Sequence, residues 1–118
     1  MTIGVIGGSG IYEALPLENV RHEHVSTPYG EPSDAVTMGD LAGREVAFLP
    51  RHGEDHRHPP TDASYQANIY ALKSVGVDRV ISTNAVGSLR EDLPPRTLVV
   101  PDQIFDRTKH RSPTFFGD

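Results

Sequence analysis

The chain has 118 residues and a formal net charge of −5, from 11 Lys and Arg against 16 Asp and Glu. Its length suits a single domain, and its acidic balance argues against a surface that binds nucleic acid or an anionic membrane. There is no cysteine, which excludes a disulfide framework and a thiolate metal site. The N-terminus lacks the basic start and apolar stretch of a secretory signal, and no segment approaches the apolar length that spans a bilayer. We therefore expect a cytoplasmic protein.

The first predicted element is a short buried strand at residues 3–6, which runs into the glycine turn Gly7-Gly8-Ser9-Gly10. Glycines let backbone amides approach an anion closely, and the Ser9 hydroxyl can donate to a phosphate oxygen. A tight turn without a ligand is the alternative. The spacing fits neither the dinucleotide fingerprint G-x-G-x-x-G nor the Walker pattern, and Pro16 interrupts the helix that either motif requires next.

The rest of the chain is predicted to alternate strands with one clear helix. In chain order, the segments are strands at 20–25, 35–38 and 45–50 with a hairpin loop at 39–43, a helix at 64–74 that stops at Gly76, and strands at 80–83 and 97–101. A strand, helix, strand order implies a parallel pair and hence an α/β sheet. In such sheets, binding groups collect where parallel strands end, at the carboxyl edge.

Arg51 and His52 follow the predicted strand at 45–50. The planar fork of Arg51 suits phosphate oxygens, and His52 can add a second donor, so the pair forms a candidate anion clamp. The alternative is a solvated loop in which these charges pair with nearby acids. The acids within reach are Glu54, Asp55 and Asp62.

The same loop is also a candidate metal site, because imidazole and carboxylate ligands of a metal often lie close in sequence. The candidates are His52, Asp55, His56 and His58. There is no H-E-x-x-H, and the first histidine of an H-x-H-x-D-H site is missing. We expect no metal.

Small residues follow the predicted strand at 80–83, and they would let a ligand lie against exposed backbone amides. Asn84 in this loop can both donate and accept a hydrogen bond. The alternative is a turn into a helix with Asn84 as its cap. Asp102 and Gln103, after the strand at 97–101, could support such a site or fill an ordinary turn role.

Six motifs, taken in order, resemble those of methylthioadenosine phosphorylases and related members of the purine nucleoside phosphorylase family. They are VIGGSG at 5–10, TPYGEPSDA at 27–35, RHG at 51–53 with His56, YQANIYALK at 65–73, GSLRE at 87–91 and DQ at 102–103. The resemblance spans virtually the whole chain but well under half of a complete family chain. It implies a three-layer α/β/α fold around a central mixed, largely parallel sheet, here incomplete. Residues 1–118 would be the N-terminal, phosphate-binding part of one domain whose C-terminal part is absent.

The resemblance implies that phosphate attacks the anomeric carbon of a purine nucleoside and releases free purine and a pentose 1-phosphate. The substrate would be 5'-methylthioadenosine, 5'-methylthioinosine or a 6-oxopurine nucleoside. Inorganic phosphate would be the co-substrate, with no other cofactor and no metal. Relatives assemble as trimers or as hexamers built from trimers, so a homo-oligomer is expected, with no nucleic-acid or membrane partner.

By motif position, the resemblance also implies residue roles. The phosphate ligands would be Ser9, Arg51, His52, Asn84 and the backbone amide of Ala85. The nucleoside would lie against His56, near its 5' substituent, and against Ala85, Val86 and Gly87. No catalytic residue is assigned within this chain.

Two departures from the family pattern qualify this reading. Asn84 stands where some methylthioadenosine enzymes carry Thr, and an Asn at this position goes with relatives that take 6-oxopurines. Ser64 replaces an Asn that is common before the Tyr65 motif. The groups that select the purine lie beyond Asp118 in the family. Two other functions stay open: a truncated, non-catalytic anion-binding or assembly fragment, and a nucleotide-cofactor domain, which the glycine spacing disfavours.

Overall fold

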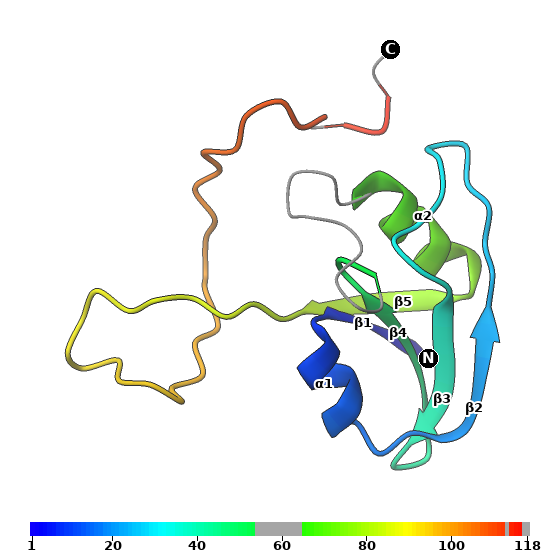
Figure 1. The fold of residues 1–118 in the computed structure, drawn as a ribbon, viewed down its shortest axis with the longest axis horizontal. Coiled ribbons are helices and arrows are strands. Elements are labelled where there is room, and N and C mark those ends of the chain that lie inside the picture. Colours follow the sequence, from blue (N-terminus) through cyan, green and yellow to red (C-terminus); the bar gives the residue numbers. More distant parts are fainter. Residues whose placement is uncertain (54–64, 113, 117–118) are drawn as a thin grey trace. The chain divides into compact units, whose positions relative to one another are not determined.

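The computed structural model describes residues 1–53, 65–112 and 114–116. They form two compact units, Met1–Asn84 and Ala85–Asp118. The first unit is built on a five-stranded sheet with the strand order β2-β3-β4-β1-β5 (Figure 1). Its elements are β1 (Thr2–Gly7), α1 (Ser9–Ala14), β2 (Glu18–Glu23), β3 (Val36–Leu41), β4 (Arg44–Pro50), α2 (Tyr65–Ser74) and β5 (Val77–Ser82).

Strand β1 lies inside the sheet and pairs in parallel with both β4 and β5. The register sets Gly7 opposite Pro50 and Ile6 opposite Ser82, so the three strands end at one edge. Strands β3 and β4 are antiparallel, as are β2 and β3, which makes the sheet mixed. The predicted α/β sheet is therefore confirmed, but the two strands that flank α2 are not the parallel pair expected: β4 and β5 each pair with β1, which lies between them.

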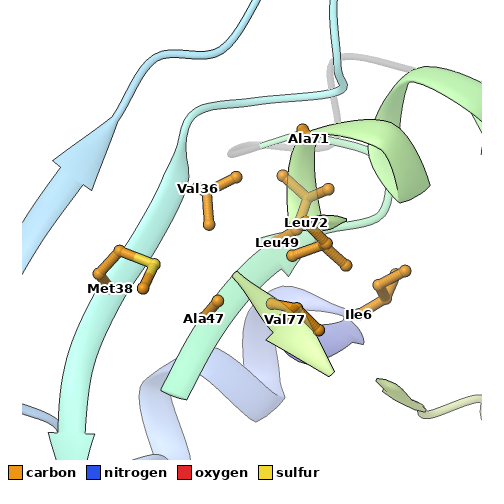
Figure 2. Close-up of a cluster of buried hydrophobic side chains, with 8 residues drawn as sticks. All are labelled: Ile6, Val36, Met38, Ala47, Leu49, Ala71, Leu72 and Val77. Atoms are coloured by element: carbon orange, nitrogen blue, oxygen red, sulfur yellow. The ribbon is translucent and has the colours of Figure 1, made fainter. Parts of the chain in front are cut away.

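Alternate residues of β1 and β4 point to opposite faces of the sheet, as strand geometry requires. One face carries the cluster drawn in Figure 2, to which α2 contributes Ala71 and Leu72. Its members are Ile6, Val36, Met38, Ala47, Leu49, Ala71, Leu72 and Val77. The other face holds Val5, Val46 and Phe48, with Tyr12 of α1 packed against them. Helices α1 and α2 thus cover opposite faces, which gives the three layers expected (Figure 1).

Several boundaries differ in detail from the predictions, and helix α1 was not predicted. It begins at Ser9, inside the expected glycine turn at 7–10, and ends ahead of Pro16, whose ring cannot continue a helix. Strand β5 begins at Val77, three residues before the predicted strand at 80–83. Strand β2 begins two residues earlier than the predicted strand at 20–25. The hairpin loop predicted at 39–43 is wrong in extent, because β3 runs to Leu41. Only Ala42 and Gly43 form the turn, with φ of 50° and 77°, the pair of positive values that a tight two-residue hairpin needs.

At the amino edge of the sheet, polar side chains link the starts of β1 and β4 with β2. The Thr2 hydroxyl donates to Glu45 at 2.8 Å, and the Arg21 guanidinium donates to the other Glu45 oxygen at 3.1 Å. These hydrogen bonds, that from Thr2 first, lower the pKa of Glu45. This edge lies opposite the one where the parallel strands end.

The second unit contains no helix or strand among its described residues. The strand predicted at 97–101 is therefore wrong: Leu98 is 96% exposed and Val100 is 93% exposed. A run of β-branched and apolar residues becomes a strand only when a neighbouring strand satisfies its backbone, and the described residues of the second unit include no strand that could do so. Across both units, the described part of the chain has no helix long and apolar enough to cross a membrane.

Candidate functional site

The segments that leave β1, β4 and β5 start side by side, because backbone hydrogen bonds continue past the strand ends. The N–H of Arg51 donates to the Gly7 carbonyl at 3.0 Å, and the N–H of Thr83 donates to the Ile6 carbonyl at 2.9 Å. Two of these segments carry candidate ligands in the described structure, namely Arg51 and His52 after β4 and Asn84 after β5. The structure therefore gathers the predicted strand ends at one edge of the sheet.

Gly7 is required at this edge for steric reasons. A Cβ at this position would lie 2.7 Å from Thr83 Oγ1 and 3.3 Å from Ile11 Cβ. A Cβ at the next residue, Gly8, would meet nothing within 4 Å. Gly7 thus lets β1, the loop after β5 and helix α1 approach one another, a role separate from bringing amides close to an anion.

We expect Gly7→Ala to lower the free energy of unfolding by about 1 to 3 kcal/mol, because the added methyl must push Thr83 or α1 away. Gly8→Ala is the matched control, since Gly8 has an extended backbone (φ −79°, ψ 173°) that alanine adopts readily. Its effect should stay below about 1 kcal/mol, because its Cβ would contact no other atom and the remaining cost is the lower preference for alanine at the N-cap of α1. Thermal melting of the two variants measures the difference, and equal losses would show that the close approach at Gly7 is unimportant.

The Arg51 guanidinium reaches across the end of β1 to the end of β5. Its Nη2 donates to Ser82 Oγ at 3.0 Å and to the Thr83 carbonyl at 2.5 Å. Within the described residues, Nε and Nη1 have no hydrogen-bond partner and the guanidinium forms no ion pair. The acids of the alternative reading, Glu54, Asp55 and Asp62, lie outside the described residues. A fixed cation with free N–H groups at a strand end is suited to an oxyanion.

His52 follows Arg51 in a tight turn closed by the N–H of Gly53, which donates to the Pro50 carbonyl at 3.2 Å. Gly53 has φ of 79°, in the left-handed region that favours glycine. The Nδ1 atom of His52 is buried and has no hydrogen-bond partner among the residues that the structure describes. A proton there would be a buried donor without an acceptor, so we infer the tautomer with its proton on Nε2. His52 would then offer one N–H donor from Nε2.

A buried polar link anchors the start of this turn to helix α2. Ser33 Oγ donates to the Pro50 carbonyl at 2.6 Å, and the Ser33 N–H donates to Asn68 Oδ1 at 2.8 Å. Ser33 and Asn68 are 3% and 2% exposed. Sequence reasoning missed this pair as support for the site. The available signal was the polar Asn68 among the small and apolar residues of a helix face that packs on the sheet.

The remaining candidates are placed as follows. Ser9 is the first residue of α1, two residues after Gly7, and its side chain is outside the description. Asn84 directly follows Thr83, and no helix begins among the described residues after it, so the helix-cap alternative is wrong. Ala85, Val86 and Gly87 belong to the second unit, where they have no regular secondary structure.

The loop that was considered as a metal site falls mostly outside the described residues. His56 lies outside the described residues, as do Asp55 and His58. Among the residues that are described, no three His, Cys, Asp or Glu side chains come together in a way that could hold an ion.

The fold and the strand ends together define a class of protein, a three-layer α/β/α protein with a nucleoside-phosphorylase-like sheet and anion-suited groups at its carboxyl edge. Residues 2–118 match the family described as the phosphorylase superfamily. The chain belongs to this superfamily.

Individual relatives agree with that assignment. The chain is 58% identical over 116 residues to the S-methyl-5'-thioadenosine phosphorylase of Chloroflexus aurantiacus and 56% identical over 115 residues to that of Gloeobacter violaceus. These alignments cover 98% of this chain but 40% and 38% of the two relatives. The chain thus spans about two fifths of the length of the relatives it matches.

Solved structures give the same picture. A methylthioadenosine phosphorylase from an antarctic soil metagenomic library superposes with a TM-score of 0.92 at 54% identity, over 98% of this chain and 40% of that one. The Schistosoma mansoni methylthioadenosine phosphorylase in complex with adenine gives a TM-score of 0.90 at 41% identity, over 100% of this chain and 43% of that one. The nucleoside-phosphorylase-like fold is therefore confirmed.

Proposed function

We propose that the full-length protein carrying this chain is a purine nucleoside phosphorylase of the methylthioadenosine type, and that this chain supplies its phosphate site. The single observation that carries the proposal is the placement of the Arg51 guanidinium at the joined ends of β1, β4 and β5, with Nε and Nη1 unpartnered among the described residues. The identity of about 50 to 58% to proteins named S-methyl-5'-thioadenosine phosphorylase supports the reaction class.

In the proposed reaction, a phosphate oxygen forms a bond to the anomeric carbon of the pentose. The bond from that carbon to the purine nitrogen breaks, its electron pair leaves with the purine, and the products are free purine and a pentose 1-phosphate. Positive charge develops on the sugar as the bond breaks, so a phosphate held beside the carbon acts as nucleophile and also stabilises the transition state.

The chain's own residues would bind and orient the phosphate. Arg51 offers charged N–H donors, and His52 offers one through Nε2 in the inferred tautomer. Ser9, Asn84 and the Ala85 amide, which follow β1 and β5, would complete the set. His56 with the 85–87 segment would contact the nucleoside. No residue of the chain is assigned to protonation of the leaving purine.

The deciding experiment follows purine release from 5'-methylthioadenosine by the full-length protein, with and without inorganic phosphate. The proposal expects release that depends on phosphate and yields equal amounts of purine and pentose 1-phosphate. Release that depends on water alone would identify a nucleoside hydrolase instead. Testing 5'-methylthioinosine and inosine in parallel gives the substrate range, because Asn84 stands where some methylthioadenosine enzymes carry Thr and goes with relatives that take 6-oxopurines.

A cytoplasmic homotrimer, or a hexamer built from trimers, belongs to the same proposal. The lack of cysteine in this chain is compatible with a reducing compartment. The assembly rests on the family resemblance, and light scattering of the active full-length protein tests it.

A further inference from the structure

The hydrogen bonds that orient Arg51 both come from the loop end of β5. Nη2 uses Ser82 Oγ at 3.0 Å and the Thr83 carbonyl at 2.5 Å. The Thr83 contact is with the backbone, so almost any residue at that position would supply it. The Ser82 contact is with a side chain, and it is therefore the one that depends on the sequence.

We propose that Ser82 is a positioning residue, whose hydroxyl holds the Arg51 guanidinium in the orientation that binds phosphate. This inference rests on the proposed function. Ser82 is the last residue of β5, and its register partner Ile6 precedes Gly7, so its hydroxyl sits at the same sheet edge as the turn that carries Arg51. With Nη2 engaged there, Nε and Nη1 are left to face the anion.

The physical reason is preorganisation. A free arginine side chain has many rotamers, and binding an anion must restrict them. A guanidinium already fixed by two acceptors has less freedom to lose when phosphate arrives. Removing the Ser82 hydroxyl leaves the Thr83 carbonyl as a single acceptor, about which the guanidinium can turn. Phosphate binding should weaken, while nucleoside binding and the chemical step at saturating phosphate should change little.

The test compares Ser82→Val with Ser82→Thr in the full-length protein. Threonine and valine have nearly the same shape and both suit a strand, so the two variants differ chiefly in the hydroxyl. Ser82 is exposed in this chain and both replacements favour a strand, so neither should disturb β5. We expect the Val variant to raise the phosphate KM roughly 3- to 10-fold and the Thr variant to stay near wild type. Ser74→Ala, which removes an exposed hydroxyl from α2, is a control expected to change neither KM.

A double variant makes the inference sharper. Because Ser82 is proposed to act only through Arg51, adding Ser82→Val to Arg51→Ala should raise the phosphate KM no further. Additive effects would overturn the inference, as would a Val variant with an unchanged phosphate KM or one whose nucleoside KM rises equally. A wild-type protein that releases purine without phosphate would instead overturn the proposed function, so the two failures are distinguishable.

Discussion

Replacing Arg51 by alanine is expected to lower kcat/KM for phosphate roughly 30- to 150-fold. This factor corresponds to a loss of about 2 to 3 kcal/mol in transition-state stabilisation. The guanidinium is the charged donor that the structure places at the joined strand ends, and its loss leaves the anion without that charge-assisted hydrogen bond. The measurement is initial-rate kinetics of the full-length protein with phosphate varied at saturating nucleoside.

Arg44→Ala is the matched control for that variant. Arg44 begins β4 and Arg51 follows its end, so the same charge is removed at the opposite edge of the sheet, about 20 Å away by strand rise. The control should leave the phosphate dependence unchanged. Equal effects of the two variants would mean that net charge, and not the placement of Arg51, governs phosphate binding.

The largest expected effect on stability comes from Phe48→Ala. Phe48 is 1% exposed, lies in β4 among Val5 and Val46, and packs against the Tyr12 ring with centroids 5.2 Å apart. Truncation removes the aromatic group that joins α1 to the sheet and leaves a cavity. We expect a loss of about 3 to 5 kcal/mol in the free energy of unfolding, measured by urea denaturation.

Phe48→Leu provides the comparison, because leucine keeps most of the apolar volume. Its cost should be no more than about 2 kcal/mol. If the free energy of unfolding of the Phe48→Ala variant were within about 1 kcal/mol of the wild-type value, Phe48 could not be the centre of the core on the α1 face.

Much of the sheet could be predicted because its buried strands are short apolar runs that end in glycine or proline. The strand at 3–6 and the strand at 45–50 match β1 and β4 closely, and the spacing of Ala67, Ala71 and Leu72 matches the buried face of α2. The apolar run at 97–101 looks the same in sequence but forms no strand. The difference is a hydrogen-bonding neighbour, which local sequence does not reveal.

The site was predictable to the extent that parallel strands end at one edge. That rule correctly predicts that Gly7, Arg51 and Thr83 lie together at this edge. It could not predict that Arg51 would bind Ser82, because that contact crosses β1 and depends on the strand order. The hydrogen-bonded link from Asn68 through Ser33 to Pro50 could not be predicted for the same reason, since it joins three segments that are far apart in the sequence.

The central claim is that the ends of β1, β4 and β5 hold phosphate. A crystal structure of the full-length protein grown with phosphate tests it most directly. The account predicts one phosphate at this edge, contacted by Arg51 and His52 and by Ser9 and Asn84 from the flanking strand ends. A phosphate bound elsewhere, with Arg51 still turned only toward Ser82 and Thr83, would contradict it.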